Sequence, residues 1–158
     1  AYRGRLEDTV DVVIVGYLRG RGARARFGIG ALLTAVYDRE ADLFRTIAKV
    51  GSGLSEQEWI ELREKLDRIA VKGKPARVDS RLVPDVWVEP RYVVAVLADE
   101  ITRSPVHTCA QDESGVGLAL RFPRVVGGVR EDKSPEDATT VEEIRQMYAT
   151  QKRHRVAS

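Results

Sequence analysis

Short runs of apolar and β-branched residues, separated by polar and glycine-rich segments, dominate the first half of the chain. Such runs are typical of strands; they occupy residues 10–15 (VDVVIV), 31–38 (ALLTAVYD) and 42–51 (DLFRTIAKVG). The connection between the last two runs is short and polar, which predicts a hairpin. Two further strands are predicted at residues 92–98 (YVVAVLA) and 116–122 (VGLALRF), with a short one near Val86.

Two segments carry helical periodicity, and each begins with a capping box. The first box is Ser55 with Glu58, followed by apolar residues at helical spacing: Trp59, Leu62, Leu66 and Ile69. The second box is Thr140 with Glu143, and its apolar face comprises Val141, Ile144 and Tyr148. The polar residues that follow, QKRHRVAS, are expected to fray.

The predicted order is three strands, a helix, two strands and a further helix. This order, with a glycine-rich basic loop between the first two strands, indicates an all-β fold with accessory helices. The matching architecture is a five-stranded Greek-key OB-fold barrel with a helix between strands three and four. We expect residues 1–138 to form the OB-fold domain and residues 139–158 to form a C-terminal amphipathic helix and polar tail.

Composition narrows the class of protein. Hydrophobic residues are 43% and charged residues 32% of the 158 positions, which is typical of one globular domain. No apolar run approaches the ~18 residues of a membrane span, and the N-terminus has no signal-peptide core. The single cysteine, Cys109, excludes an internal disulfide and is expected to have no chemical role. No His or Cys cluster has metal spacing, so we predict no metal site. Because no membrane-spanning run is present, we also predict no membrane partner.

Arginine carries most of the positive charge. The chain has 20 Arg and 6 Lys against 24 acidic residues, for a net charge of +2. Arginine suits bidentate contacts to phosphate, although a general bias towards arginine would give the same count. Asparagine is absent, which indicates a hot environment that selects against thermolabile amides, and hence a thermophile.

Four arginines lie in the loop between the first two strands, residues 18–27 (LRGRGARARF): Arg19, Arg21, Arg24 and Arg26. On an OB barrel this loop flanks the nucleic-acid face. Glycines between the arginines let the backbone approach phosphates while the guanidinium groups bind their oxygens. The alternative is a solvated loop without a ligand.

A second basic segment, LRFPR at residues 120–124, ends the last predicted strand. Alternation along the strand places Arg121 and Phe122 on opposite faces. Pro123 ends the strand because it lacks a backbone donor, and Arg124 follows in the turn. Gly127 and Gly128 then predict a sharp reversal of the chain.

A third basic segment is REDK at residues 130–133. Arg130 and Lys133 can clamp a polyphosphate, with Asp132 holding one of them in place or facing a metal, and Ser134 can cap the next turn. A surface ion-pair cluster would use the same residue types, and the spacing leaves both readings open. No complete active site is found elsewhere, because no phosphate-binding glycine loop is present. Asp8 and Asp11 would point to opposite faces of one strand.

Residues 120–144, LRFPRVVGGVREDKSPEDATTVEEI, resemble the C-terminal motif of ATP-dependent DNA ligases of the archaeal and eukaryotic replicative type. That pattern is RFPR, a short spacer, and RxDK. Other segments agree in order: DTVDVVIVG, GRGARARFGIGALLTAVYD, KVGSGLSEQE, VPDVWVEPRYVVAV and ITRSPVHT. The resemblance covers nearly the whole chain. Ser52 stands where the family usually has Thr, and Ala95 where it often has Glu; neither belongs to the RxDK motif.

The resemblance implies an OB-fold domain of a nick-sealing enzyme. The family's adenylated lysine lies in a KxDG motif, which this sequence lacks. We therefore expect a domain that works with a nucleotidyltransferase domain encoded upstream and that is inactive alone. ATP and Mg²⁺ would be bound mainly by that other domain. Sealing comprises three phosphoryl transfers, in which positioning and charge neutralisation provide most of the catalysis.

The resemblance also implies two poses of the domain. In one, Arg130, Asp132 and Lys133 cover the ATP site and hold its β- and γ-phosphates during lysine adenylation. In the other, the domain rotates onto the minor groove of nicked duplex DNA; the implied DNA contacts are Arg121, Phe122, Arg124, Arg21, Arg24 and Arg26. The C-terminal helix can either dock on the nucleotidyltransferase domain or pack on the barrel.

The expected partners are nicked double-stranded DNA, the nucleotidyltransferase domain, and a sliding clamp bound through regions outside this chain. The expected location is the cytoplasm of an archaeon, or the nucleus if the source is eukaryotic. Two alternatives remain: a single-strand-binding OB module, and the OB domain of an RNA ligase or capping enzyme. The first would require aromatic platforms, yet only 6% of residues are aromatic. The RFPR element favours DNA ligase over the second.

Overall fold

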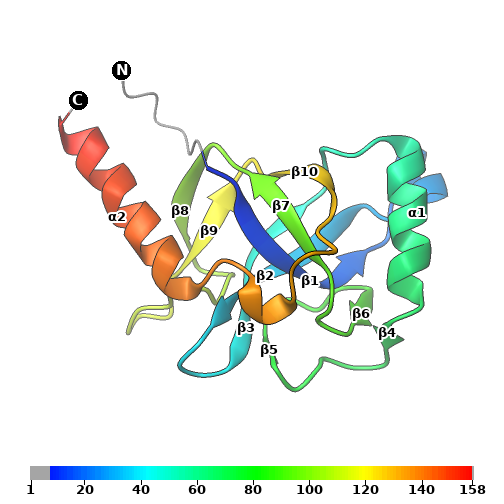
Figure 1. Cartoon of the computed structure of the whole chain (residues 1–158), viewed down its shortest axis with the longest axis horizontal. Helices are drawn as coiled ribbons and strands as arrows, with labels where there is room; N and C mark the ends of the chain where they lie inside the picture. The colour runs from blue at the N-terminus through cyan, green and yellow to red at the C-terminus, as the bar shows by residue number, and fades with distance from the viewer. Residues whose placement is uncertain (1–7, 158) are drawn as a thin grey trace.

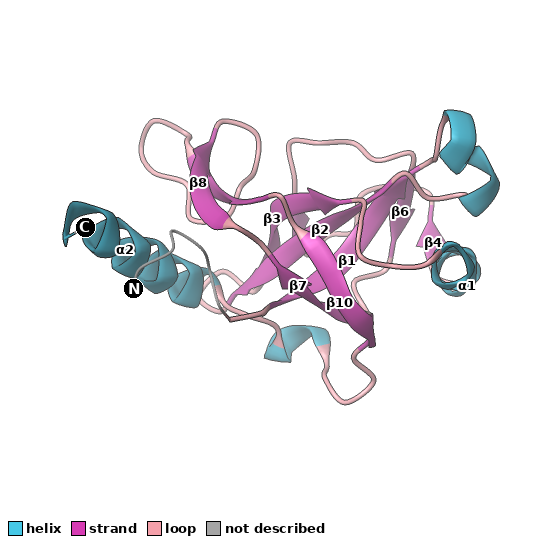
Figure 2. Ribbon diagram, turned by 90° about the horizontal axis from the view of Figure 1, so that it is seen from above, coloured by secondary structure: helices cyan, strands magenta, loops and turns pink. Residues whose placement is uncertain are grey.

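The structure is a computed structural model that describes the backbone of residues 8–157 and the side chains of residues 8–152. Within this part, an eight-stranded sheet contains the strand order β10-β7-β1-β2-β3-β5, and β6 pairs with β1 and β4 beside that path. A separate hairpin joins β8 and β9. Figure 1 shows α1 and α2 at opposite ends of this β-structure, and Figure 2 shows the same arrangement from above.

Ten strands and two α-helices make up the described elements. The strands are β1 (Val10–Leu18), β2 (Ala31–Asp38), β3 (Leu43–Val50), β4 (Ala70–Val71), β5 (Val78–Asp79), β6 (Val86–Val88), β7 (Val93–Leu97), β8 (Glu100–Ser104), β9 (Gly117–Arg121) and β10 (Arg124–Val129). The helices are α1 (Glu56–Asp67) and α2 (Val141–Ala157), with short 3₁₀ turns η1 (Gly22–Phe27) and η2 (Pro135–Asp137). The prediction of a mostly-β fold with accessory helices is confirmed, with more strands than the five expected.

The central strand β1 explains the apolar run at the start of the chain. Its side chains alternate between two core clusters, with Val12 and Ile14 in one and Val13 and Val15 in the other. Because successive side chains of a strand point to opposite faces, a strand that is covered on both faces needs apolar residues at nearly every position. Asp11 is the exception in the run VDVVIV, and its side chain is only 13% exposed.

Both predicted helices are confirmed, and both capping boxes form. Ser55 accepts a hydrogen bond from the backbone N–H of Glu58, whose carboxylate accepts one from Ser55 N–H. The same reciprocal pair joins Thr140 and Glu143. Helix α1 buries Trp59 and other apolar residues in the main core, as its spacing predicted.

The apolar face of helix α2 packs on the β-structure of this chain, while its docking on a nucleotidyltransferase domain stays a prediction. Ile144 is fully buried, and α2 contacts β8 and β2. The Gln151 side chain binds both backbone groups of Ile101 on β8: its Oε1 accepts from N–H at 2.8 Å, and its Nε2 donates to the carbonyl at 2.8 Å. The tail that was expected to fray is helical in its backbone as far as Ala157; its side chains from residue 153 on lie outside the described residues.

The course of the chain after β9 differs from the prediction. The chain bends at Phe122, which has a left-handed backbone with φ 52°, and the glycine pair does not form the predicted reversal. Gly127 and Gly128 instead lie inside β10, where the pairing with β7 shifts register between Val126 and Val129. A pair of residues that accommodates a β-bulge lets the strand continue where a turn was predicted.

Three further strands were missed: β8, because its sequence EITRS is largely polar, and β4 and β5, because each comprises only two residues. Strand β8 pairs with β9 as a hairpin whose outer positions remain partly exposed. None of the helices in the described residues has the length and apolar character needed to cross a membrane.

Candidate functional site

Arg130, Asp132 and Lys133, here called the RxDK cluster, lie together just after β10. Arg130 donates from Nε to Asp132 Oδ1 at 3.1 Å and from Nη2 to Asp132 Oδ2 at 3.0 Å. This is a two-pronged contact, which fixes the plane of the guanidinium group. The hydrogen bond to Asp132 raises the pKa of Arg130, and the same contact lowers the pKa of Asp132. Both groups are therefore charged across the physiological range.

The cluster has a fourth member, Asp11 of β1, that the sequence reasoning did not assign to it. Asp11 Oδ1 accepts from Arg130 Nη1 at 3.3 Å, and Asp11 Oδ2 accepts from Lys133 Nζ at 2.7 Å. Asp11 was considered only as a partner for Asp8, which lies outside β1 and is exposed. A signal that could have identified Asp11 is its position as the one carboxylate inside an otherwise apolar strand.

Enough donors remain in the RxDK cluster to bind a phosphate. A guanidinium group has five N–H donors and an ammonium group has three. Arg130 uses three and Lys133 uses one on Asp132 and Asp11. Two donors on each residue are left, and both side chains are about one third exposed. The cluster therefore has four N–H donors that it can offer to an anionic ligand.

Ser134 occupies the N-cap position of η2, as predicted, but its side chain makes no capping hydrogen bond. Its hydroxyl donates to Asp137 Oδ2 at 2.8 Å, and no side-chain hydrogen bond caps η2. The side-chain acceptor Asp137 lies within reach of the hydroxyl, so the serine is satisfied without the backbone.

The second candidate group, here called the RFPR turn, consists of Arg121, Phe122 and Arg124 around Pro123. Phe122 is 64% exposed, and the Arg121 guanidinium carbon lies 5.0 Å from the centroid of its ring. Arg124 donates to Asp99 Oδ1 at 3.3 Å and to the carbonyl of Phe122 at 3.2 Å. The prediction that Arg121 and Phe122 point apart is wrong, because the left-handed backbone at Phe122 breaks the alternation of the strand.

The loop arginines differ from one another in their contacts. Arg21 is exposed and makes no side-chain hydrogen bond or ion pair with the described residues. Arg26 is 70% exposed and pairs with Glu56 at 3.1 Å. Arg24 turns inward: Nη1 donates to the carbonyl of Gly51 at 2.7 Å, and its guanidinium carbon lies 5.2 Å from the Trp59 ring centroid. Arg24 therefore holds η1 against α1, and its contact with DNA stays a prediction.

The chain after β3 joins the basic loop to the RFPR turn. Gly51 accepts from Arg24, and the next residue, Ser52, donates from Oγ to the carbonyl of Pro123 at 3.3 Å. Val125 N–H donates to the carbonyl of Ser52 at 2.9 Å. Gly53 has φ 109°, and a Cβ there would lie 2.1 Å from the carbonyl oxygen of Val125, so glycine is required for this approach. The basic loop and the RFPR turn are thus connected through residues 51–53.

The RxDK cluster lies at the other end of β10. Five residues, 125–129, lie between Arg124 and Arg130. Because the strand bulges at its glycine pair, Arg124 pairs with Leu97 and Arg130 binds Val93, four positions apart on β7, which is roughly 13 Å at about 3.3 Å per residue. Arg130 is itself fixed to the sheet, since its N–H donates to the carbonyl of Val93 at 2.7 Å. Two basic groups therefore lie at opposite ends of one strand.

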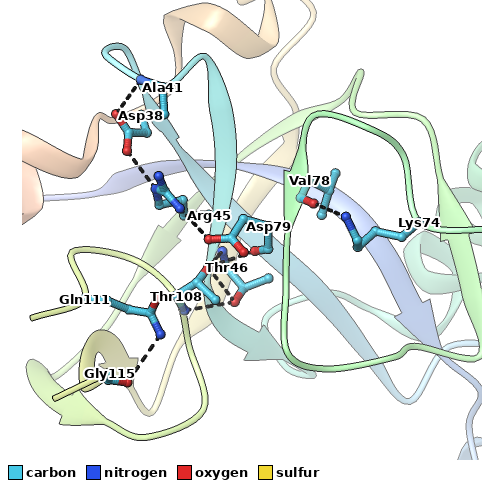
Figure 3. Close-up of polar contacts among 10 residues, drawn as sticks. All are labelled: Asp38, Ala41, Arg45, Thr46, Lys74, Val78, Asp79, Thr108, Gln111 and Gly115. Carbon is cyan, nitrogen blue, oxygen red and sulfur yellow. Dashed lines mark hydrogen bonds and ion pairs between the residues drawn. The ribbon is translucent and has the colours of Figure 1, made fainter. Parts of the chain in front are cut away.

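A third polar network, shown in Figure 3, has a structural role. Arg45 on β3 pairs with Asp38 at 2.7 Å and with Asp79 on β5. The Thr108 hydroxyl donates to the carbonyl of Asp79 at 2.8 Å, and Thr46 N–H donates to that hydroxyl at 3.0 Å. These contacts tie β3, β5 and the segment after β8 together. Although burial opposes it, the two carboxylates raise the pKa of Arg45.

Other chemistry is limited in the described residues. No three side chains of His, Cys, Asp or Glu lie together there as a group that could hold a metal ion. Cys109 is fully buried, and burial raises the pKa of its thiol to about 12. A thiol with that pKa stays protonated at neutral pH and is a poor nucleophile.

The fold and the two basic groups define a class of protein: an OB-fold-like domain with two groups of basic side chains at its surface. The model of the ATP dependent DNA ligase C terminal region matches residues 25–133. The chain belongs to this family.

Relatives and solved structures agree with this assignment. The chain is 62% identical over 156 residues to a probable DNA ligase from Dictyoglomus turgidum, and 50% identical over 149 residues to a DNA ligase from Sulfurisphaera tokodaii. Those matches cover 99% and 93% of this chain but 27% and 24% of the relatives. The ligase domain of M. tuberculosis LigD matches with a TM-score of 0.60 and 27% identity, over 84% of this chain and 38% of that one. The OB-like fold is thereby confirmed.

Proposed function

We propose that this chain is the OB-fold domain of a nick-sealing, ATP-dependent DNA ligase and that it presents two faces in turn. The observation that carries the proposal is the position of the RxDK cluster and the RFPR turn at opposite ends of β10. The backbone positions of Arg124 and Arg130 are roughly 13 Å apart along the sheet, and separate carboxylates, Asp99 and Asp11, hold their guanidinium groups, so the two arginines do not converge on one phosphate. Two successive poses of the domain let each group serve its own ligand.

In the first pose, the RxDK cluster binds the β- and γ-phosphates of ATP. Arg130 and Lys133 offer their four remaining N–H donors to phosphate oxygens, and Asp132 keeps the Arg130 guanidinium in its plane. Fixed cations aimed at the pyrophosphate stabilise the charge that develops as it leaves. A mycobacterial DNA ligase D that this chain resembles has been solved in complex with ATP, which supports a nucleotide as the ligand.

In the second pose, the RFPR turn meets nicked duplex DNA. The exposed Phe122 offers an apolar contact for sugars in the minor groove, and its neighbours Arg121 and Arg124 would contact phosphates. Arg21 and Arg26, in the basic loop that residues 51–53 connect to this turn, would extend the contact along the DNA backbone. Most of the affinity would come from phosphate contacts, so binding should weaken steeply with salt.

The remaining parts of the reaction are assigned outside this chain. The nucleotidyltransferase domain of the same enzyme would supply the adenylated lysine and bind Mg²⁺, and any sliding clamp would bind elsewhere. The matched relatives come from bacteria and archaea, so we place the protein in the cytoplasm.

Substitutions in the full-length ligase separate the two faces. We expect Arg130→Ala and Lys133→Ala to slow self-adenylation by about 100-fold or more, because each removes a charge-stabilising donor, while sealing of a pre-adenylated nick is spared. Phe122→Ala should do the reverse. Arg103→Ala, an exposed arginine paired with Asp112, is the matched control and should change neither step. Equal loss of both steps in the RxDK variants would contradict the proposal.

Binding measurements test the single-strand alternative. Nicked duplex and single-stranded DNA of equal length should be titrated against the full-length enzyme. Preference for single strands would favour a plain OB binding module, which stacks bases on aromatic platforms; preference for the nick supports the ligase assignment.

A further inference from the structure

Asp11 links the two cations of the RxDK cluster, although it comes from a distant part of the chain. Its two carboxylate oxygens are divided between them, Oδ1 to Arg130 at 3.3 Å and Oδ2 to Lys133 at 2.7 Å. Its side chain is 13% exposed, against 36% for Arg130 and 32% for Lys133. The carboxylate therefore lies beneath the cations, and their free donors remain on the solvent side.

The backbone around Asp11 is held more firmly than a surface ion pair requires. On one side Asp11 pairs with Ala95 of β7. On the other side Asp11 N–H donates to Thr139 Oγ1 at 2.9 Å, and Thr139 N–H donates to the carbonyl of Asp11 at 2.9 Å. Thr139 also accepts from Tyr37 N–H at 3.0 Å, so it fills the space between β1 and β2.

The same contacts bracket the RxDK loop. Its first residue is held by Val93, through the hydrogen bond from Arg130 N–H, and the segment that follows it is held at Thr139. Asp11 lies on the strand between these two anchors, since β1 pairs with β7. A carboxylate on a rigid strand thus sets the positions of two long, otherwise flexible side chains.

Charge and donor counts show that Asp11 need not compete with a phosphate. Two cations face two carboxylates, Asp11 and Asp132, so the cluster is neutral before a ligand binds. Since four N–H donors remain free, a phosphate can be bound without breaking either contact to Asp11. Side chains held in advance lose less conformational entropy when they bind.

We propose that Asp11 is the positioning residue of the RxDK cluster, holding Arg130 and Lys133 at the separation that adjacent phosphoryl groups of a nucleoside triphosphate require. This inference rests on the proposed function of the cluster and adds a residue from the opposite end of the chain. Asp11 touches neither substrate nor the reacting atoms.

Asp11→Asn in the full-length ligase tests the proposal. The amide keeps one acceptor oxygen but places an N–H₂ group against the other cation, so the pair is no longer held together. We expect the rate of self-adenylation at saturating ATP to fall roughly 10- to 100-fold, the effect of one charge-assisted hydrogen bond. Sealing of a pre-adenylated nick should be unchanged, a separation that a general loss of stability would not produce.

Two variants keep the test decisive if Asp11→Asn folds poorly. Asp11→Glu keeps the charge but moves it by about 1.5 Å, and it should give an intermediate loss of adenylation. Asp38→Asn is the matched control, since Asp38 is also a partly buried carboxylate, 19% exposed and 2.7 Å from its cation Arg45. It should lower the midpoint of thermal unfolding without slowing adenylation.

The outcomes separate this inference from the proposed function. If Arg130→Ala and Lys133→Ala adenylate normally, the phosphate role of the cluster is wrong. If those variants lose adenylation while Asp11→Asn and Asp11→Glu retain it, only the positioning role of Asp11 is overturned. Parallel loss of both steps in the Asp11 variants would likewise overturn it.

Discussion

Phe122 combines two features that a purely structural residue would avoid. Its backbone has φ 52°, a region in which side chains other than glycine cost roughly 1–2 kcal/mol, and the residue is 64% exposed. Neither feature helps the fold, and non-glycine residues in strained backbone conformations gather at functional sites. The strain therefore supports the role of the RFPR turn in binding independently of its charge.

Comparison of Phe122→Gly with Phe122→Ala tests this reading. Both changes remove the ring and should weaken binding to nicked duplex equally. Glycine accepts a left-handed backbone whereas alanine does not, so the glycine variant should have the higher free energy of unfolding, by about 1 kcal/mol. Urea denaturation of both variants measures the difference. An alanine variant at least as stable as the glycine variant would mean that the turn is not strained.

Among the elements, helix α2 is attached to strand β8 by the side chain of Gln151, which binds the edge of that strand. Gln151 is 6% exposed and satisfies both backbone groups of Ile101, as a neighbouring strand would. Ile144, which lies on the apolar face of the same helix, is fully buried. The helix therefore belongs to the barrel in this structure, and Gln151 covers a strand edge that would otherwise be open.

Gln151→Ala should destabilise the domain by about 2 kcal/mol. The change leaves a buried N–H and a buried carbonyl of Ile101 without partners, and unsatisfied groups of this kind cost roughly 1–3 kcal/mol. Gln146→Ala, at an exposed position of the same helix, is the matched control. Thermal and urea unfolding of the chain provide the measurement. Equal stability of the two variants would contradict a stabilising role for the contact between Gln151 and Ile101.

For the whole molecule, one buried group makes stability depend on pH. His107 is 8% exposed, and its Nδ1 has no hydrogen-bond partner. Burial, and secondly the charge of Lys49, lowers the pKa of His107 from 6.5 to about 4. The folded state thus binds fewer protons than the unfolded state between these values, and its stability is full above pH 6.5.

We expect the free energy of unfolding to fall as the pH decreases from about 6.5 to 4, by on the order of 3 kcal/mol from this group. His107→Gln should flatten that part of the profile, because it removes the titrating group. Urea midpoints at a series of pH values between 7 and 4 measure both slopes. Identical slopes for the variant and the parent would exclude His107 as the cause.

Local patterns were sufficient for the order of elements and for the motifs. Both capping boxes, the apolar faces of the helices and the strands β1, β2, β3, β7 and β9 follow from residues near one another in sequence. The glycine pair was misread because glycine permits both a reversal and a bulge. The pairing of β10 with β7 favours the bulge over the reversal, and this pairing cannot be predicted from the local sequence pattern.

The sequence alone determined a mostly-β domain with two capped helices, and it contained the RFPR and RxDK motifs that mark the family. Only the tertiary structure decided what those residues touch. Asp11 meets Arg130 across 119 positions of chain, Arg24 turns towards Gly51 and Trp59, and Arg121 lies over Phe122. The physical reason is the range of the interactions: periodicity and caps act within a few residues, whereas ion pairs form wherever folding brings opposite charges together.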